Sequence, residues 1–420
     1  MTKTSAAATR APAPSRPRID RRLTTSLGFA QVGCYVVWGA AGSVLLARQL
    51  EDIDPTRKEA NLAVVMAVGA VVATLAQPVW GMFSDRTRSR FGRRTPHILA
   101  GALLGALGLI ATALSSTVLT VAVSWCVVQV AVTSAAGMLN AVLPDRVPAA
   151  VRATVSAVVG LGTFAGLVGG QFLAAALVPR GTLLAYGTTA LLLVLTLTAF
   201  TVICPDTPST GERPPRQLSL RLLCGLVWIS PRKYPDFAWA FLGRLLLLLG
   251  YHTVTGYQLY ILQDYIGLGR DQALEAIPLV GAVVLATGVA SLIVCGRLSD
   301  RMGRRKPFVI AATLLIGLGL SVPLLVPSLT GMLLYAALGG LGFGCYQAVD
   351  VALITQVLPS QEDAAKDLGV AGIAAHLPQV LAPALAGVVV VSLGYQPLFG
   401  LAFASCVLGA LCTLPIKSVT

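Results

Sequence analysis

Long hydrophobic stretches and short polar segments alternate along almost the whole chain. A helix needs about 20 apolar residues to cross the roughly 30 Å of hydrocarbon in a lipid bilayer, and twelve stretches are of about that length. They are residues 24–47, 61–82, 97–115, 117–141, 153–178, 182–203, 237–262, 273–296, 307–326, 330–356, 369–392 and 396–414. The pattern therefore predicts an all-α membrane protein with about 12 transmembrane helices.

The composition argues against a soluble protein. Charged residues make up 12% of the 420 residues, about half of the roughly 25% that is typical of soluble domains. Apolar residues reach 55%, and the mean hydropathy is +0.78. So few charges could not cover the surface of a soluble fold of this size. A soluble enzyme, a nucleic-acid-binding protein and a disordered chain are all poor interpretations.

The meaning of the net charge of +13 depends on where the basic residues lie along the chain. The loops on one side of the expected membrane and both tails carry 25 Lys and Arg residues, whereas the loops on the other side carry five. Because basic loops stay in the cytoplasm, we expect a multi-pass protein of the cell membrane with both termini cytoplasmic. The basic excess then reports topology and contact with anionic membrane lipids, and we expect no nucleic-acid partner.

An internal repeat divides the spans into two halves. Residues 81–86 (GMFSDR) match residues 296–301 (GRLSDR), and residues 92–96 (GRRTP) match residues 303–307 (GRRKP). Two parallel six-span repeats around a central cavity are a plan known from secondary transporters. The expected organisation is a disordered cytoplasmic tail (1–22), a six-helix bundle (23–203), a cytoplasmic linker (204–236), a second six-helix bundle (237–414) and a short cytoplasmic tail (415–420).

The paired G-x-x-S-D-R…G-R-R-x-P loops resemble the signature of major facilitator superfamily transporters and its second-half echo. The resemblance covers nearly the whole chain, from about residue 24 to residue 414. The longer first copy, residues 84–94 (SDRTRSRFGRR), is similar to the loop of sucrose transporters and of glycoside–pentoside–hexuronide symporters. The resemblance implies transport of a small organic solute, with a sugar or glycoside slightly favoured.

The repeated loops are candidates for a conformational latch. An Asp at a helix end can face the positive N-terminus of a neighbouring helix and nearby Arg side chains, and such contacts can break as the halves move. The alternative is that the basic residues only anchor the topology, which does not explain an Asp at the same place in both halves. The latch set is Gly81, Asp85, Arg86, Gly92, Arg93, Arg94, Gly296, Asp300, Arg301, Gly303, Arg304 and Arg305.

Four ionisable residues lie inside predicted spans, where they are costly and therefore candidates for function. They are Arg244, His252, Asp350 and His376. Arg244 and Asp350 each lie about seven residues from the same side of the membrane, roughly 10 Å deep, so we expect them to pair. Protonation of Asp350 would then loosen the pair and couple proton movement to transport. A purely structural bridge is the alternative, and His376 fits a buried neutral histidine better than a proton carrier.

Two further acidic residues, Asp264 and Glu275, are expected near the outer ends of spans, where water can solvate them. The central cavity is expected to draw its polar and aromatic residues from the first, fourth, seventh and tenth spans, as the family resemblance implies. Amide groups can pair with hydroxyls, and aromatic faces can stack on sugar rings or flat apolar ligands; ordinary helix packing is the alternative for any one of them. The set is Gln31, Tyr35, Trp38, Trp125, Gln129, Asn140, Tyr251, Tyr257, Gln258, Tyr346 and Gln347.

Glycines in the fifth predicted span recur every fourth residue, at Gly162, Gly166 and Gly170. This spacing lets two helix backbones approach each other closely. The surrounding segment partly resembles the fifth-span motif of drug/proton antiporters, but Gly166 stands where that motif has a proline. Close packing is therefore the favoured interpretation.

Absent motifs narrow the function. No G-x-x-x-x-G-K phosphate loop, H-E-x-x-H or G-x-S-x-G motif occurs, so an ATP-driven pump or a metal hydrolase is not expected. No acidic residue interrupts the first or second predicted span, which favours protons over sodium as the coupling ion. We predict a monomeric, proton-coupled secondary transporter working by alternating access, with no cofactor and no metal. Efflux of a drug or secondary metabolite is the alternative to uptake, and a membrane enzyme or sensor is a distant third.

Overall fold

The structure is a computed structural model that describes residues 20–148, 151–209, 232–357 and 364–417. Within these ranges it is helical and contains no β-strand. The first half contains α1 (Arg21–Val37), η1 (Trp38–Leu45), α2 (Leu46–Ile53), α3 (Lys58–Arg86), α4 (Thr95–Ala113), α5 (Val118–Arg146), α6 (Arg152–Leu177), η3 (Val178–Arg180) and α7 (Thr182–Ile203). The second half contains α9 (Pro235–Thr255), α10 (Gln258–Tyr260), η4 (Ile261–Tyr265), α11 (Arg270–Met302), α12 (Lys306–Leu325), α13 (Leu329–Gln356), α14 (Ala364–Leu393) and α15 (Tyr395–Thr413).

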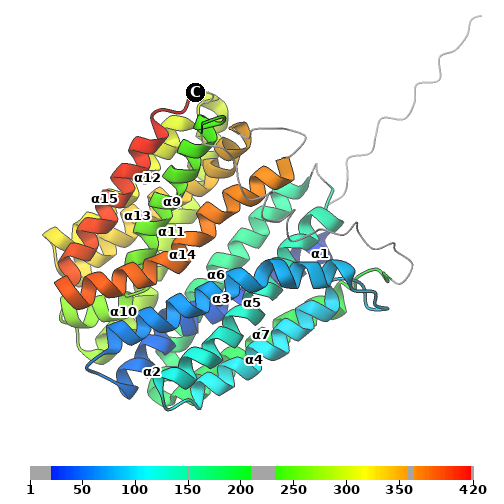
Figure 1. Ribbon diagram of the computed structural model, residues 1–420, viewed down its shortest axis with the longest axis horizontal. Helices are drawn as coiled ribbons and strands as arrows, with labels where there is room; N and C mark the ends of the chain where they lie inside the picture. The colour runs from blue at the N-terminus through cyan, green and yellow to red at the C-terminus, as the bar shows by residue number, and fades with distance from the viewer. Residues whose placement is uncertain (1–19, 149–150, 210–231, 358–363, 418–420) are drawn as a thin grey trace, which may run out of the picture.

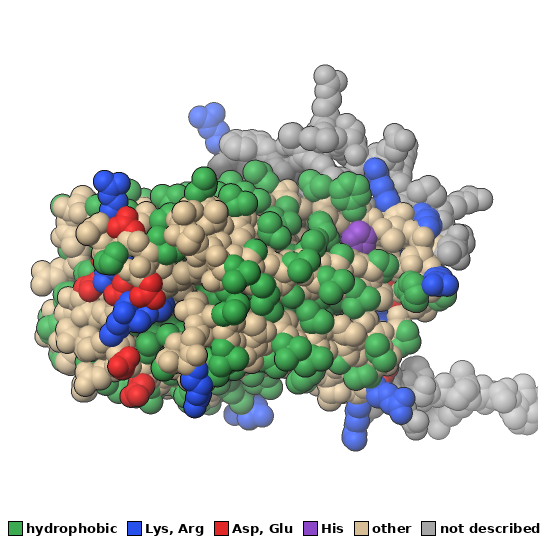
Figure 2. All heavy atoms as spheres, turned by 90° about the horizontal axis from the view of Figure 1, so that it is seen from below, with side chains coloured by type: hydrophobic (Ala, Val, Ile, Leu, Met, Phe, Trp, Pro, Cys, Tyr) green, Lys and Arg blue, Asp and Glu red, His purple; other side chains and the backbone are tan. Residues whose placement is uncertain are grey.

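The described residues form 12 helices that are long and apolar enough to cross a membrane, as the hydrophobic pattern predicts. On the face shown in Figure 2, hydrophobic side chains cover the middle and charged side chains gather toward the two ends. This distribution suits a protein whose middle lies in hydrocarbon. All-α architecture and multi-pass membrane insertion are thus confirmed.

The first span is longer than the apolar run that predicts it. The predicted range is 24–47, whereas the helix runs from Arg21 to Ile53. It begins at Arg21 because the Asp20 carboxylate accepts hydrogen bonds from the Arg22 and Leu23 amides, at 2.9 and 3.2 Å, as an N-cap residue does. At its other end the helix continues as α2, whose charged residues extend past the apolar run.

The seventh span is interrupted, which the sequence pattern misses. The predicted span is continuous over 237–262, but α9 ends at Thr255 and the chain continues as the short α10 and the π-helix η4. At the interruption the Tyr257 hydroxyl oxygen lies 3.2 Å from the backbone carbonyl oxygen of Glu59 and 3.3 Å from that of Pro383, and it can donate its one hydrogen to either. The interruption falls at Thr255-Gly256-Tyr257-Gln258, which is more polar than the leucines before it. The predicted range 237–262 runs across this polar segment and therefore does not show the break.

The two halves repeat the same helix packing, in agreement with the sequence repeat (Figure 1). In the first half α1 packs on α6 and α7, α5 on α3 and α4, and α4 on α7. The equivalent helices of the second half make the same pairs: α9 with α14 and α15, α13 with α11 and α12, and α12 with α15. Between the halves, α3 packs on α14 and α6 on α11.

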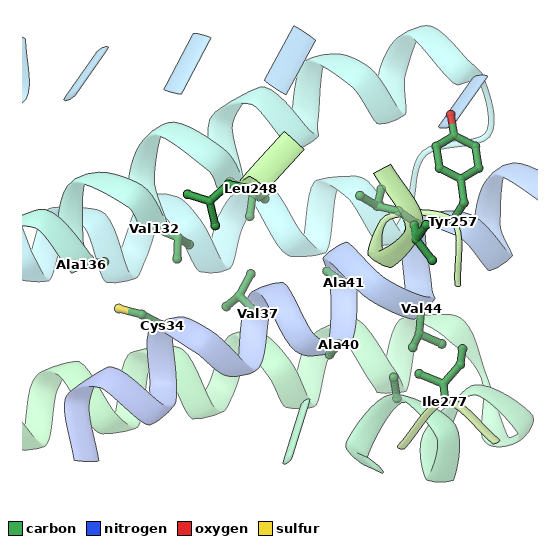
Figure 3. Packing of buried hydrophobic residues seen from close by; sticks show 14 of the residues in the cluster. Cys34, Val37, Ala40, Ala41, Val44, Val132, Ala136, Leu248, Tyr257 and Ile277 are labelled. Carbon is green, nitrogen blue, oxygen red and sulfur yellow. The ribbon is translucent and has the colours of Figure 1, made fainter. Parts of the chain in front are cut away.

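The predicted close approach at the fifth-span glycines is present. A Cβ atom on Gly162, Gly166 or Gly170 of α6 would overlap backbone oxygens of α1, namely those of Gly28, Val32 and Val36. This tight packing holds the first span in a position where its residues contact both halves. In Figure 3, Val37 of α1 and Val44 of η1 lie among residues of α5, α9 and α11.

The bundle has two ends that differ in charge. The basic end carries the α3–α4 and α11–α12 loops and the first and last described residues, and the far end carries the α2–α3 turn and the segment between η4 and α11. In Figure 1, α2 and α10 lie at the lower left, away from the C-terminus at the top. The segments predicted as a disordered tail and most of the linker (1–19, 210–231 and 418–420) lie outside the described residues.

Candidate functional site

Two amide side chains of α5 bind polar side chains of the first span. Gln31 Nε2 donates to Asn140 Oδ1 at 2.7 Å, and Trp38 Nε1 donates to Gln129 Oε1 at 2.9 Å. The Tyr35 ring meets the Trp38 ring edge-on, with centroids 4.8 Å apart. Four of these five residues are buried or half-buried, while Asn140 is exposed. The helical stripe predicted on the first span therefore faces α5 and forms a hydrogen-bonding surface.

An aromatic cluster joins the two halves near mid-membrane. The Tyr251 ring of α9 stacks on the Phe343 ring of α13, with centroids 4.9 Å apart and planes 15° from parallel. Phe164 of α6 meets Phe343 edge-on at 6.4 Å, and both phenylalanines stand at the midpoints of their helices. Tyr251 is among the residues predicted to line the cavity, whereas Phe164 and Phe343 are not. Their mid-span position is the only signal that could have found them.

Arg244 and Asp350 form the contact predicted from their equal depth. Arg244 Nη2 lies 3.3 Å from Asp350 Oδ2, with the side chains 19% and 5% exposed. The pair lies at a cavity of about 10 Å³ that Thr313, Tyr346 and Thr413 also line. These residues come from α9, α12, α13 and α15, so the cavity is enclosed within the second half rather than between the halves.

This buried pair is incompletely satisfied. Asp350 Oδ2, Arg244 Nε and the Tyr346 hydroxyl are buried and make no hydrogen bond. Buried polar groups without partners are costly, and a cavity of this size has room for about one water molecule. The pair is therefore buried, close to a space for water, and only partly hydrogen-bonded.

The remaining residues that were predicted to line the cavity do not lie together, because they differ in depth and in the helix that carries them. Trp125 is fully buried beside Gly69 of α3, inside the first half. Tyr257 and Gln258 are buried near the far end, whereas Gln347 is exposed on α13. The His252 ring meets the Tyr251 ring edge-on at 5.5 Å. The side chains of His376, Asp85 and Asp300 lie outside the described part of the structure.

The loop motifs at the basic end share two local features in both halves, although Gly92 lies within a longer loop and Gly303 directly follows α11. The Ser84 hydroxyl donates to the Arg93 carbonyl at 3.3 Å, and the Ser299 hydroxyl donates to the Arg304 carbonyl at 3.2 Å. Gly92 and Gly303 both have positive φ, at +87° and +62°, a backbone conformation that glycine adopts without strain. This conformation explains why the motif has a glycine at that position in each copy.

The motif arginines bind acidic residues of their own half. Arg93 and Arg94 both contact Asp145 Oδ2 of α5, at 3.0 and 3.1 Å, while their backbone amides donate to Asp206, each at 3.0 Å. Neither acidic residue is among the predicted site residues. Asp145 directly follows residues 142–144 (VLP), which recur as residues 357–359 at the end of the tenth predicted span. Arg86, Arg301 and Arg304 are exposed, and Gly81 and Gly296 are half-buried.

The far end shows the opposite arrangement, because its ion pairs join the two halves. Lys58 of α3 binds Asp264 of η4 at 2.8 Å, and Arg270 of α11 binds Glu51 and Asp52 of α2, Glu51 at 3.3 Å. The expectation that Asp264 is only solvated is therefore wrong, because hydrophobicity cannot show that a cation of the other half reaches it. Glu275 is exposed, as expected.

Two tyrosines complete the far-end contact. The Tyr260 hydroxyl donates to the Ala47 carbonyl at 2.7 Å, which links α10 to α2. The Tyr395 hydroxyl oxygen lies 3.2 Å from Glu59 Oε1 and 3.1 Å from Asp264 Oδ2. The hydrogen bonds and ion pairs of Lys58, Tyr257, Tyr260, Arg270 and Tyr395 thus join the two halves at this end.

Comparison with known proteins gives a family match over nearly the whole chain. The family model described as Major Facilitator Superfamily matches residues 27–294 and 274–419. An uncharacterised MFS-type transporter of Schizosaccharomyces pombe is 27% identical over 186 residues, which is 42% of this chain and 40% of that relative. The chain thus aligns with less than half of that relative's length.

Solved structures of similar fold are also transporters. A structure of the nucleoside transporter NupG has a TM-score of 0.74, with 14% identity over 94% of this chain and 98% of that chain. A mutant of the same protein gives a TM-score of 0.76, with 13% identity over 94% and 99%. A bacterial homologue of the human lysosomal transporter Spinster, in an inward-facing and unoccupied conformation, gives 0.64, with 14% identity over 94% of each chain. At these identities the likeness concerns the fold.

Proposed function

The chain belongs to the Major Facilitator Superfamily, and we propose that it is a proton-coupled secondary transporter that moves a small organic solute by alternating access. The family match, the 12 candidate spans and the repeated halves support a transporter. Proton coupling, the class of solute and the direction of transport go beyond the family assignment and are proposed.

The buried Arg244–Asp350 pair is the observation that carries proton coupling. A charge left alone inside a membrane span is expensive, so protonation of Asp350 weakens its hold on Arg244 and changes which packing of the second half is preferred. Because α9 and α13 also carry Tyr251 and Phe343, a change at the pair reaches the aromatic cluster through the same two helices. Proton binding and movement of the halves are thereby linked.

The polar and aromatic surfaces suit a ring-shaped solute with hydroxyl groups. The amides of Gln31, Gln129 and Asn140 can exchange hydrogen bonds with sugar hydroxyls, and the Tyr251–Phe343 stack offers an aromatic face to a ring. A sugar or glycoside taken up with protons is therefore the favoured substrate. Efflux of a drug or secondary metabolite is the alternative, favoured by the aromatic cluster and its lack of fixed charge.

Transport into proteoliposomes with an imposed pH gradient tests the proposal. The solute panel contains sugars, nucleosides and other glycosides, and aromatic drugs. We expect wild-type protein to accumulate one class with the gradient, and Asp350→Asn to lose accumulation while keeping solute exchange. Accumulation that survives in Asp350→Asn would place proton coupling elsewhere.

A folding control is needed because removing one member of a buried pair costs about 3–5 kcal/mol. The double variant Arg244→Gln with Asp350→Asn removes both charges and avoids an uncompensated one. We expect it to fold better than Asp350→Asn and to lack gradient-driven accumulation in the same way. A double variant that accumulates solute normally would show that the pair is only structural.

We further propose that the basic end faces the cytoplasm of a cell membrane, with both termini there. The asymmetry of Lys and Arg between the two sides supports this orientation. In that orientation the far end is outside, and the contacts between halves at the far end correspond to an inward-facing state. A cysteine in place of Thr56 that an impermeant reagent failed to reach from outside intact cells would contradict the orientation.

A further inference from the structure

An open groove of about 600 Å³ lies along the start of α7. It is lined by Arg180, Leu183, Leu184, Gly187, Thr188 and Leu191, together with the turn at Gly181. Residues 184, 187 and 191 recur every three to four positions, so they lie on one face of the helix. Because α7 packs on α1, α4 and α6 (Figure 1), the groove belongs to the first half alone.

Gly187 forms a notch in the middle of the groove. Leu184 and Leu191, one turn before and one turn after it, are 49% and 56% exposed. Apart from the backbone of its own helix, a Cβ on Gly187 would meet one atom within 4 Å, Ile110 Cδ1 of α4 at 3.9 Å. Exposed leucines suit any helix that faces lipid. A notch between two leucines, with Ile110 as its floor, offers a hydrocarbon chain van der Waals contact on three sides.

Arg180 closes the groove at the far end of the bundle. One candidate span ends at Arg180 and the next begins at Thr182, so the Arg180 side chain lies where hydrocarbon gives way to lipid headgroups. Arg180 is exposed, and its Nη1 donates to the Ala176 carbonyl at 2.9 Å. Within the described part of the chain no carboxylate lies within ion-pair distance of it. The other N–H groups of the guanidinium can therefore bind an anion.

The length of the groove matches one leaflet of a bilayer. Leu191 follows Arg180 by eleven residues, which is about 16 Å along a helix. One leaflet contributes about half of the roughly 30 Å of hydrocarbon. A lipid with its phosphate at Arg180 therefore extends an acyl chain past Gly187 and ends near Leu191, close to the middle of the membrane.

We propose that this groove binds a phospholipid, with its phosphate on Arg180 and one acyl chain in the Gly187 notch. The planar guanidinium suits a phosphate because it offers several N–H groups in a fixed fork, and basic residues beside membrane helices bind lipid headgroups in this way. Since the groove lies within the first half, its occupancy leaves the ion pairs between the halves unchanged. The site is independent of the solute and of the coupling ion.

Native mass spectrometry of the full chain in detergent tests the site. The probe is dipalmitoyl phosphatidylglycerol, and the measurement is the ratio of lipid-bound to lipid-free protein. We expect Arg180→Gln, which removes the cation, to lower this ratio about tenfold. Gly187→Leu fills the notch and should lower it by a similar factor. Arg180→Lys keeps the charge and should lower it less than Arg180→Gln does.

Two matched variants make the same kinds of change outside the groove. Arg57→Gln removes an exposed arginine from the α2–α3 turn, also at the far end. Gly169→Leu adds a leucine at an exposed glycine of α6, where nothing lies within 4 Å of the added Cβ. Both should bind the probe as wild type does. Equal losses in these controls, or wild-type binding in both Arg180→Gln and Gly187→Leu, would overturn the site and leave only non-specific lipid contact.

Other probes separate the phosphate from the chain. Dioctanoyl phosphatidylglycerol keeps the phosphate, but its chains end before Leu191, so wild type should bind it more weakly than the dipalmitoyl lipid. In Gly187→Leu the two lipids should bind alike. Dipalmitoylglycerol has the chains without the phosphate, and wild type and Arg180→Gln should bind it equally.

Two results would assign the groove to another occupant. Displacement of the lipid by inorganic phosphate would show that Arg180 binds a free anion. A dimer that Gly187→Leu converts to a monomer, with lipid binding unchanged, would show that a second copy of the chain covers this face. Either result would overturn the phospholipid site.

Discussion

The two ends of this molecule use charged residues in opposite ways. At the far end, Lys58 and Arg270 bind carboxylates of the other half. At the basic end, Arg93 and Arg94 bind Asp145 of their own half. Charges that pair within one half need not separate when the halves move, whereas charges that pair between the halves do. In the proposed alternating-access cycle, the far-end pairs are therefore the contacts that must break.

The α2–α3 turn illustrates how the far end is prepared for this contact. Hydrogen bonds lower the pKa of Asp54 below its ordinary value. The Thr56 hydroxyl makes the largest contribution, and Asn61 and the Arg57 amide add to it. The resulting charged cap orders the turn between Ile53 and Lys58. The turn therefore presents Glu51, Lys58 and Glu59 together, on two successive helices, toward the second half.

The largest expected effect comes from the glycines of the repeated loop. Gly92→Ala adds a Cβ that would overlap Asp206 and strains a backbone with φ of +87°, so we expect a loss of about 3 kcal/mol in stability. Gly303→Ala has φ of +62° and nothing within 4 Å of the added Cβ, and should cost about 1 kcal/mol. Thermal unfolding in detergent compares the two, and equal losses would contradict a role for Asp206 in holding this loop.

A charge reversal at Arg270 is expected to have the next largest effect. Arg270→Glu places a third carboxylate beside Glu51 and Asp52, and we expect the fraction open at the far end to rise about tenfold, the equivalent of 1.4 kcal/mol. The measurement is the distance between spin labels on Ser116→Cys, in the α4–α5 loop, and Thr330→Cys, at the start of α13, in a Cys-depleted background; both residues are exposed. Arg180→Glu is the control, because Arg180 hydrogen-bonds the Ala176 carbonyl within its own half, and it should leave the distance unchanged.

The smallest effect is expected at the basic end. Asp145→Asn removes the charge that Arg93 and Arg94 share, and because these side chains are partly exposed we expect a loss of at most about 1 kcal/mol in stability. The Ser116–Thr330 label distance should equal that of wild type. A longer or shorter distance in Asp145→Asn would mean that the pairs within the first half also control the far end.

Some residues of the candidate site could be predicted from the sequence, and others could not. Arg244 and Asp350 could be paired from sequence because a lone charge in a span is costly and both stand at one depth. Gln31, Tyr35 and Trp38 could be placed on one face because helical periodicity is local. Asp145, Phe164 and Phe343 could not be singled out from the sequence. Many membrane helices end in a charged pair such as Asp-Arg, and many carry a single phenylalanine. Asp264 was misjudged because its partner, Lys58, is 206 residues away.

By itself, the sequence determined the 12 spans, the two repeated halves and the positions of the buried charges. These follow from the cost of burying polar groups in hydrocarbon, which acts on each segment separately. Only the tertiary structure decided that the Arg244–Asp350 cavity lies inside the second half and that Glu59, Asp264 and Tyr395 meet across the far end. Those contacts depend on how the two helical bundles pack against each other. Because a local pattern of hydrophobic and polar residues carries no information on that packing, it cannot specify which residues of the two halves touch.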